Sequence, residues 1–249
     1  MSQGLGVQLG LGGGKSATSG GAPGGGGGGR APFIPNTRSV LFDGANDFFK
    51  LASTIPFTGA FTFSCWVKPA GTAEGFIASG ETGSSGPNIT WLPPATWSAA
   101  YVTNMGTIYS GGNTIQAGTW YNLVLIRDGS NLLTLYRNGS ALGATPTFSG
   151  TVDFQWFGAR RLNDTTGSTF LNGHLDEIAL WDSDRTSNLA AIYNSGVAGD
   201  LWEVSPPLHW YRMGDINSGS GVTIADIGSA ADNDGTLVNG PAVTTDVPS

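Results

Sequence analysis

The chain has 249 residues with a formal net charge of -7, and 40 of its residues are glycine. This acidic balance argues against binding to nucleic acid or to an anionic membrane, because phosphate contacts need clustered Lys and Arg. The only cysteine, Cys65, excludes an internal disulfide and a cysteine-based metal site, and we expect it to be a buried hydrophobic residue.

The chain also lacks the patterns of a membrane or export segment. No window approaches the roughly 20 apolar residues of a membrane span, and no basic region followed by an apolar stretch opens the sequence. We therefore expect no membrane insertion and no signal peptide.

Residues 1–36 form a predicted glycine-rich arm, separate from a folded domain at 37–249. Fourteen glycines leave too little apolar area to offset the entropy of ordering this backbone, so alone the arm should be disordered. We expect it to become ordered against a neighbouring subunit, as a flexible arm or anchor. Its longest glycine run consists of Gly24, Gly25, Gly26, Gly27, Gly28 and Gly29.

From Ser39 onward the sequence changes to short apolar runs with a period of two, which predicts successive antiparallel strands. In residues 60–68, Phe61, Phe63, Cys65 and Val67 alternate with polar residues and Trp66, so they share one face of a strand. Residues 120–127 and 132–137 predict a hairpin that turns at Asp128-Gly129, and residues 154–158 and 170–182 predict further strands.

Residues 186–195 predict the only good helix, with Thr186 or Ser187 as its cap and Gly196 after its end. An apolar strand is expected at 208–213, whereas the tail from Asn217 has only weak strand signals. The chain is therefore predicted to be all-β, with one short helix.

Several segments together resemble the laminin G-like, concanavalin A-like domains. They are VLFDG at 40–44, FTFSCWV at 61–67, WYNLVLIRDG at 120–129, YRNG at 136–139 and LNGHLDEIALW at 171–181. The resemblance implies an antiparallel concanavalin-type jelly-roll β-sandwich, with its core at 39–196 and a C-terminal strand and tail at 205–249.

Residues 208–215 and 234–240 resemble the tail that follows such domains in structural proteins of tailed bacteriophages. This resemblance implies a non-enzymatic protein of the virion surface, either a capsid decoration protein or a component of a tail fibre. Such a protein would assemble in the host cytoplasm, contact other virion proteins through residues 1–36 and form a homo-oligomer.

Some relatives of this fold are glycosidases, which need two carboxylates about 5 to 10 Å apart. Asp176 and Glu177 are adjacent, so a regular strand would point them to opposite faces, and Asp182 lies about 20 Å further along it. We interpret Asp176 and Glu177 as structural. His174 and His209 are also interpreted as structural, because no Gly-x-Ser-x-Gly elbow surrounds a candidate nucleophile.

An alternative function is that of a lectin or host-receptor adhesin that binds a cell-surface glycan. Exposed aromatic rings would contact the sugar, and the least patterned stretch of the chain carries the candidates Trp91, Trp97, Tyr101 and Tyr109. The same rings could instead fill the sandwich or a subunit interface, since eight exposed tryptophans would leave large apolar patches.

No cofactor is expected other than calcium, which laminin G-like domains often bind at a loop rim. Calcium takes six to eight oxygen ligands, and Asn163 and Asp164 are the best candidates to supply them. A solvated turn explains these two residues equally well. Asp43, Asp47, Asp128 and Asp182 are further available carboxylates.

Overall fold

A computed structural model describes residues 33–71, 75–80, 88–91, 100–102, 106–109, 116–142, 147–162, 165–216 and 221–249. Residues 33–249 form one compact unit, to which the description below applies. The predicted arm, with Gly24 to Gly29, lies outside the described residues except for 33–36.

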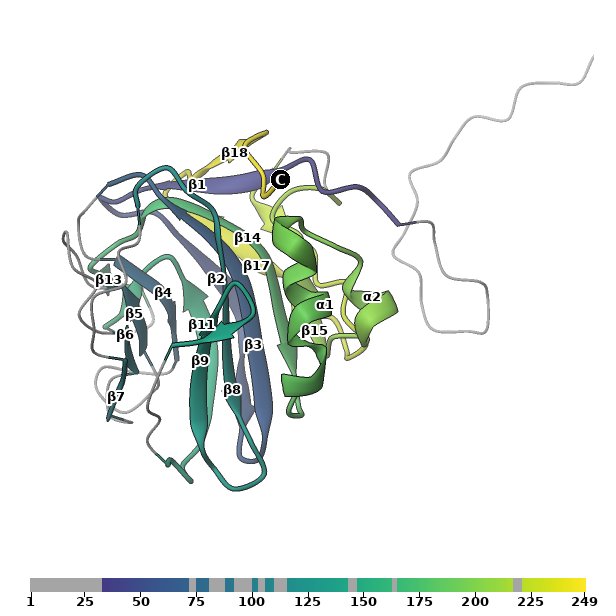
Figure 1. The fold of residues 1–249 in the computed structure, drawn as a ribbon. Helices are drawn as coiled ribbons and strands as arrows, with labels where there is room; N and C mark the ends of the chain where they lie inside the picture. Colours follow the sequence, from purple (N-terminus) through teal and green to yellow (C-terminus); the bar gives the residue numbers. More distant parts are fainter. Residues whose placement is uncertain are drawn as a thin grey trace, which may run out of the picture. The chain divides into compact units, whose positions relative to one another are not determined.

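Two antiparallel sheets form the body of this unit (Figure 1). The first sheet has the strand order β10-β9-β8-β3-β14-β1-β18, and β15 also pairs with β14. Its strands are β1 (Ser39–Asp43), β3 (Phe61–Pro69), β8 (Tyr121–Arg127), β9 (Leu133–Arg137), β10 (Ser140–Ala141), β14 (Asn172–Trp181), β15 (His209–Tyr211) and β18 (Ala242–Thr244).

The second sheet has the order β16-β17-β2-β11-β4-β5-β6-β7, and β12 and β13 make a separate two-stranded ribbon. Its strands are β2 (Phe48–Phe57), β4 (Gly75–Ser79), β5 (Asn88–Trp91), β6 (Ala100–Val102), β7 (Gly106–Tyr109), β11 (Val152–Phe157), β16 (Thr223–Ile224) and β17 (Gly235–Val238). The ribbon consists of β12 (Arg160–Arg161) and β13 (Gly167–Ser168). The chain is thus the predicted all-β, concanavalin-type sandwich.

The main core lies between the two sheets and follows the predicted alternation. Phe61, Phe63, Cys65 and Val67 are at most 1 % exposed and belong to this core. Phe63 stacks on Phe154 of the second sheet, with ring centroids 5.2 Å apart. Cys65 is a free cysteine that is fully buried, so the prediction of a buried hydrophobic cysteine is confirmed, and this burial raises the pKa of its thiol.

Two short helices cover part of the outer face of the first sheet (Figure 1). They are α1 (Leu189–Tyr193), which lies between the 3₁₀ turns η1 (Thr186–Asn188) and η2 (Asn194–Gly196), and α2 (Leu201–Val204). A second apolar cluster joins Leu189 and Ile192 of α1 to Trp181 and Trp210 of the sheet. The helices therefore cover the part of this face around Trp181 and Trp210.

The predicted helix lies at the expected place in the chain, but its predicted N-terminal cap is wrong. Asp184 Oδ1 accepts hydrogen bonds from the N–H and the hydroxyl of Thr186, at 2.8 and 2.6 Å. Neither Thr186 nor Ser187 acts as a side-chain cap of these turns. The helix ends at Tyr193, and its C-cap Asn194, with a φ of 46° in the left-handed region, lies two residues before the predicted stop at Gly196.

The hairpin of β8 and β9 is confirmed, with Leu125 paired to Leu135. The tail was underestimated, because β16, β17 and β18 all come from residues after Asn217. β17 pairs with β2 of the second sheet and β18 pairs with β1 of the first. The C-terminal tail therefore completes both sheets.

A β-bulge in β14 overturns the expectation that Asp176 and Glu177 point to opposite faces. The register against β3 shifts between Asp176 and Ala179, and Glu177 has a φ of 47°. Because the bulge inserts an extra residue, both carboxylates lie on the outer side of the sheet. Asp176 pairs with Trp66 there, and Glu177 accepts a hydrogen bond from Trp210.

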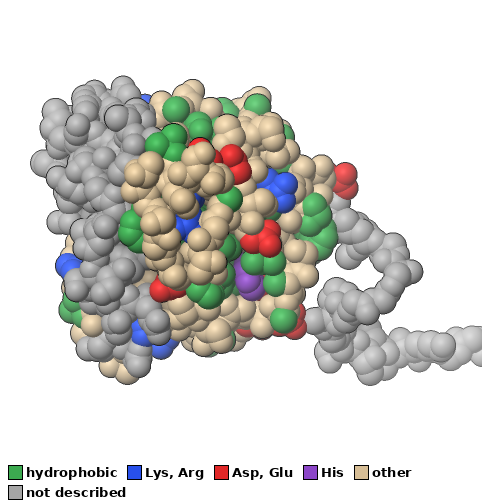
Figure 2. All heavy atoms as spheres, turned by 90° about the horizontal axis from the view of Figure 1, so that it is seen from below, with side chains coloured by type: hydrophobic (Ala, Val, Ile, Leu, Met, Phe, Trp, Pro, Cys, Tyr) green, Lys and Arg blue, Asp and Glu red, His purple; other side chains and the backbone are tan. Residues whose placement is uncertain are grey.

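No helix among the described residues has the length and apolar character needed to span a lipid bilayer. On the face shown in Figure 2, the acidic and basic side chains of the described residues are interspersed rather than gathered into a patch of one sign.

Candidate functional site

Four side chains meet on the outer face of the first sheet, and we call them the Asp246 cluster: Lys68, Trp120, His174 and Asp246. Lys68 of β3 lies directly opposite His174 of β14, so the two side chains share one face. Trp120 immediately precedes β8, and Asp246 follows β18, which brings the tail back beside β1.

The Asp246 carboxylate is held by two donors. Its Oδ2 lies 2.5 Å from Lys68 Nζ, and its Oδ1 accepts a hydrogen bond from Trp120 Nε1 at 3.0 Å. His174 Nε2 lies 3.8 Å from Oδ2, and the rings of Trp120 and His174 are 5.7 Å apart. The Asp246 side chain is 40 % exposed, so this cluster is open to solvent.

The charges of the cluster follow from these contacts. Burial acts to raise the pKa of Asp246, but the hydrogen bonds from Lys68 and Trp120 outweigh it and lower that pKa. Burial lowers the pKa of His174, although the Asp246 charge opposes this effect. At neutral pH the cluster therefore holds the Asp246 carboxylate and a neutral His174 imidazole.

A serine also lies beside His174, but the geometry is not that of a hydrolase. Ser39 Oγ is 3.0 Å from His174 Nδ1, and its hydroxyl also donates to the Asp246 carbonyl oxygen at 2.5 Å. Ser39 is fully buried, so a substrate carbonyl cannot reach it. These contacts agree with the interpretation that His174 is not a catalytic base.

A second group, which we call the buried acid cluster, contains Asp176, Glu177 and Asp215 around Arg212. Arg212 Nε lies 2.9 Å from Glu177 Oε1, and its Nη2 lies 3.2 Å from Asp215 Oδ2. Glu177 Oε2 accepts a hydrogen bond from Trp210 Nε1 at 2.6 Å. Glu177 is 3 % exposed and Asp176 is not exposed, so both carboxylates are closed to a sugar.

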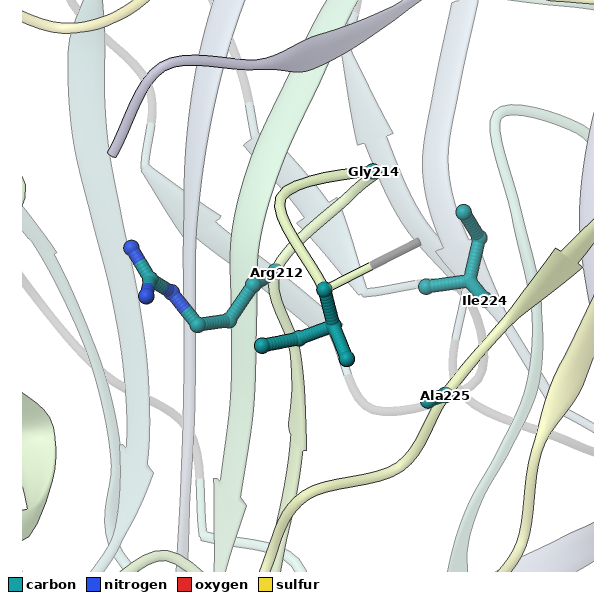
Figure 3. Close-up of a pocket in the computed structure, with 5 residues that line it drawn as sticks. Arg212, Gly214, Ile224 and Ala225 are labelled. Atoms are coloured by element: carbon teal, nitrogen blue, oxygen red, sulfur yellow. The ribbon is translucent and has the colours of Figure 1, made fainter. Parts of the chain in front are cut away.

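Burial raises the pKa of Glu177 to about 7, against the opposing effect of Arg212. It also raises the pKa of Asp176, and the neighbouring Glu177 charge adds to this effect. The adjacent depression is lined by Arg212, Gly214, Ile216, Ile224 and Ala225 and has no room for a water-sized molecule (Figure 3). The raised pKa values therefore reflect burial rather than a substrate cleft.

Residues 33–37 cover the buried acid cluster. The Arg212 guanidinium lies 5.0 Å from the Phe33 ring centroid, and its Nη1 donates to the Ile34 carbonyl oxygen. Asn36 Nδ2 donates to Asp176 Oδ2 at 2.8 Å, and the Thr37 N–H and hydroxyl both donate to Asp215 at 2.9 Å. The last residues of the predicted arm are thus packed on the sandwich.

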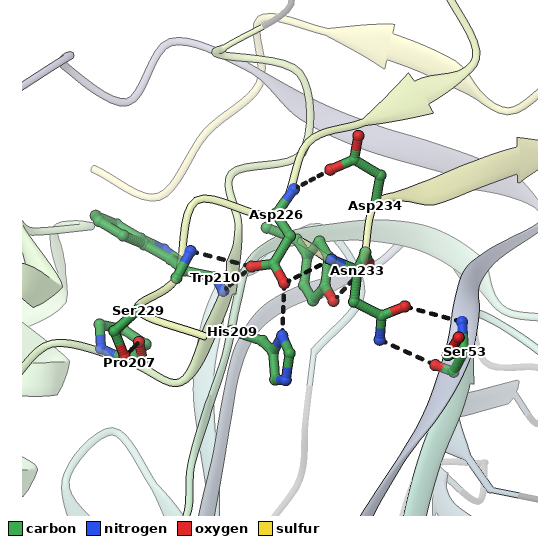
Figure 4. Close-up of polar contacts among 10 residues, drawn as sticks. Ser53, Pro207, His209, Trp210, Asp226, Ser229, Asn233 and Asp234 are labelled. Carbon is green, nitrogen blue, oxygen red and sulfur yellow. Dashed lines mark hydrogen bonds and ion pairs between the residues drawn. The ribbon is translucent and has the colours of Figure 1, made fainter. Parts of the chain in front are cut away.

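His209 belongs to a third polar group, shown in Figure 4. Its Nδ1 lies 2.5 Å from Asp226 Oδ2, while Asp226 Oδ1 accepts from the N–H groups of Trp210 and Gly228 at 3.0 Å. Asn233 bonds the N–H and carbonyl of Ser53 through its side-chain amide. This group ties the tail to β15 and β2, which supports a structural role for His209.

The predicted glycan-binding aromatics lie mostly on strands rather than in a loop. Trp91 is on β5, Tyr101 on β6 and Tyr109 on β7, at the end of the second sheet. The register places Ala100 opposite both Trp91 and Tyr109. Trp97 lies outside the described residues.

The predicted calcium ligands, Asn163 and Asp164, also lie outside the described residues. Within the described part of the chain, no group of three His, Cys, Asp or Glu side chains is arranged so that it could hold a metal ion. Asp43 instead accepts hydrogen bonds from the N–H groups of Ala45 and Asn46, which contribute to lowering its pKa against the effect of burial. Calcium binding stays a prediction.

Sequence reasoning missed the Asp246 cluster. Trp120 is 126 residues from Asp246 and Lys68 is 178 residues from it, so no local spacing signals the contact. The strand that delivers Asp246 has only three residues, which is too few for a period of two to be visible.

Comparison with known proteins agrees with the fold. The family model described as the concanavalin A-like lectin/glucanases superfamily matches residues 43–189. A candidate carbohydrate-binding protein from Bacteroides ovatus is 17 % identical over 86 % of this chain, with a TM-score of 0.62. The match covers 62 % of that protein, so the chain spans less than two thirds of its length.

Two further solved structures are similar over shorter stretches. The heptameric SAP-like pentraxin of Limulus polyphemus is 18 % identical over 66 % of this chain and 84 % of its own, with a TM-score of 0.48. Domain 4 of an arabinanase from Geobacillus stearothermophilus, in complex with arabinotriose, is 17 % identical over 62 % and 76 %, with a TM-score of 0.41. Curated proteins give no match to the sequence.

Proposed function

The chain belongs to the concanavalin A-like lectin/glucanases superfamily, and we propose that within it this protein is a non-enzymatic, carbohydrate-binding module. The family match over residues 43–189 is the observation that carries the proposal. The family includes both lectins and glucanases, so the choice between binding and hydrolysis depends on the carboxylates.

Those carboxylates favour binding. A glycosidase needs an acid and a second carboxylate that both reach the scissile bond. Asp176 and Glu177 do lie on one side of the first sheet, but each is buried and already hydrogen-bonded to a protein donor. A sugar cannot reach them without removal of residues 33–37 from the buried acid cluster.

Two parts of the chain carry aromatic residues for the proposed sugar contact. One is formed by β5, β6 and β7, which carry Trp91, Tyr101 and Tyr109, with Trp97 between β5 and β6 in the sequence. The other is the Asp246 cluster, where a half-buried indole lies beside an exposed carboxylate. Aromatic rings pack on the apolar faces of sugars, and carboxylates accept hydrogen bonds from sugar hydroxyls.

A glycan array with the full chain, run with and without a calcium chelator, tests the proposal. We expect selective binding, which the double variant W91A/W97A should abolish if β5–β7 form the contact. Trp202→Ala is the matched control, because Trp202 packs on the cluster below α1. Circular dichroism must show each variant folded. If the folded chain binds no glycan on the array, the proposal is wrong. If the chain releases sugar from a polysaccharide, the proposal that it is non-enzymatic is wrong.

Attachment to a virion, homo-oligomerisation and assembly in the host cytoplasm stay proposals that rest on the resemblance of the tail. Their test is co-sedimentation of the chain with particles, with and without residues 1–32. Loss of association on deletion is the required result, whereas retention contradicts attachment through the arm. Residues 33–36 are left in place because they contact the sandwich.

A further inference from the structure

The Asp246 cluster has the composition of a carboxylate-binding site whose occupant is the chain's own tail. We propose that Lys68, Trp120 and His174 form a cradle for the carboxylate of an acidic sugar, and that Asp246 fills this cradle as a displaceable internal ligand. The inference rests on the proposed carbohydrate-binding function and names the class of sugar.

The cradle is built on paired strands of the first sheet. Lys68 and His174 lie opposite each other on β3 and β14, two adjacent strands inside the first sheet. Trp120 is placed by the start of β8, which pairs with β3 on its other side. A binding site on paired strands keeps its donors in position when the ligand leaves.

Its donors match a carboxylate. Lys68 Nζ and Trp120 Nε1 bond the two different oxygens of Asp246, at 2.5 and 3.0 Å. One donor is a cation and the other a neutral N–H, so the pair neutralises the charge while fixing the plane of the carboxylate. His174 Nε2 lies 3.8 Å from Oδ2, beyond hydrogen-bond distance, so His174 borders the cradle without donating to the carboxylate.

The backbone of the occupant is anchored, because Ser39 donates to the Asp246 carbonyl oxygen, but its side chain is able to leave the cradle. Among the described strands, β18 pairs with β1 alone, over the three residues from Ala242 to Thr244, and Asp246 lies beyond that pairing. Pro248 is buried, so release of the whole tail would be costly. The Asp246 side chain, however, is 40 % exposed, and its rotation toward solvent is enough to empty the cradle.

An acidic sugar fits the emptied cradle better than a bare carboxylate does. The sugar carboxylate would take over both donors, while the sugar ring would lie beside the half-buried indole of Trp120. Because Asp246 competes from within the same chain, it lowers the apparent affinity for any external carboxylate. Removing its carboxylate should therefore strengthen binding.

The experiment compares glucuronate, glucose and acetate as probes of the wild-type chain and of Asp246→Ala. Calorimetry gives the affinity, and NMR follows the indole N–H signal of Trp120, assigned with Trp120→Phe. We expect Asp246→Ala to bind glucuronate at least about tenfold more tightly than the wild type. Adding Lys68→Met to that variant should remove the gain. Asp232→Ala, which loses an exposed carboxylate elsewhere, is the matched control and should behave as the wild type.

Two results would overturn the inference. One is equal affinity of the wild type and Asp246→Ala for glucuronate, including no binding by either. The other is binding of acetate or glucose by Asp246→Ala as tight as that of glucuronate. If the glycan array still shows binding of neutral glycans, these results leave the proposed carbohydrate-binding function intact. If no folded variant binds any glycan on the array, the proposed carbohydrate-binding function is wrong as well.

Discussion

Arg212 Nε lies 2.9 Å from Glu177 Oε1, and both residues are almost completely buried, at 2 % and 3 % exposure. The pair joins the bulge of β14 to the residue that follows β15, so it connects the main body of the sandwich to its C-terminal part. A buried ion pair contributes little by itself, but the loss of one partner leaves an uncompensated charge.

Substitution of Arg212 should therefore be strongly destabilising. We expect Arg212→Met to lower the free energy of unfolding by about 3–5 kcal/mol, because Glu177 and Asp215 lose their cation. Denaturant unfolding measures this change. Arg185→Met, on a half-exposed arginine, is the control and should change stability by less than about 1 kcal/mol. A similar small change for Arg212→Met would show that the buried ion pair is unimportant.

Glu177 should make the free energy of unfolding depend on pH between about 4.5 and 7. Its pKa is raised to about 7 from an ordinary value of 4.5, so the folded state binds the proton more tightly than the unfolded state. The resulting stability is fully present below pH 4.5 and is lost as pH rises through about 7. The wild type should thus lose stability relative to Glu177→Gln between pH 5 and pH 8.

The measurement is the unfolding midpoint of both proteins in denaturant at several pH values. Titration of His174 affects both proteins and cancels in the difference. Asp43 and Asp246 have lowered pKa values, so their effects lie at lower pH. A difference between the two proteins that is constant with pH would contradict the raised pKa of Glu177.

The contact between Asp246 and His174 should be detectable in the pKa of His174. Burial lowers the pKa of His174, and the Asp246 charge partly restores it, while Lys68 acts against it. Asp246→Ala should therefore lower the His174 pKa further, as measured from the pH dependence of its imidazole NMR signals. Asp232→Ala should leave it unchanged. An unchanged His174 pKa in Asp246→Ala would mean that the tail does not lie beside His174 in solution.

Two truncations of the arm should differ in stability. Deletion of residues 1–32 leaves every described contact of the sandwich in place. Deletion of residues 1–36 also removes the Ile34 carbonyl that Arg212 contacts and the Asn36 amide that bonds Asp176. We expect the longer deletion to cost about 2 kcal/mol more, because buried polar groups lose their partners. Equal denaturation midpoints would show that residues 33–36 only rest on the surface.

Much of the sandwich was predictable because its strands follow simple alternation. The inward positions of β3 and the hairpin of β8 and β9 confirm this. The bulge at Glu177 was not predictable, because a positive φ at a glutamate is imposed by its tertiary contacts with Trp210 and Arg212. The hydrogen bonds that Asp184 accepts from Thr186 were missed because Thr186 and Ser187 are themselves good cap residues.

The tail was hard to predict for another reason. β16 and β18 have only two and three residues, and each is defined by its partner strand rather than by its own pattern. Gly235 of β17 illustrates this dependence, since a Cβ at that position would overlap the Phe49 ring of the neighbouring strand. A glycine in a strand signals such a close approach only once the neighbour is known.

The pairing of β18 with β1 has a consequence for how the molecule assembles. Ser39 and Thr244 are hydrogen-bonded although 205 residues separate them in the chain. During synthesis, one edge of β1 therefore stays uncovered until residues 242–244 have been made. Contacts between such distant residues slow folding, and an uncovered strand edge is a site of aggregation. The sandwich should therefore become resistant to proteolysis only after β18 has left the ribosome.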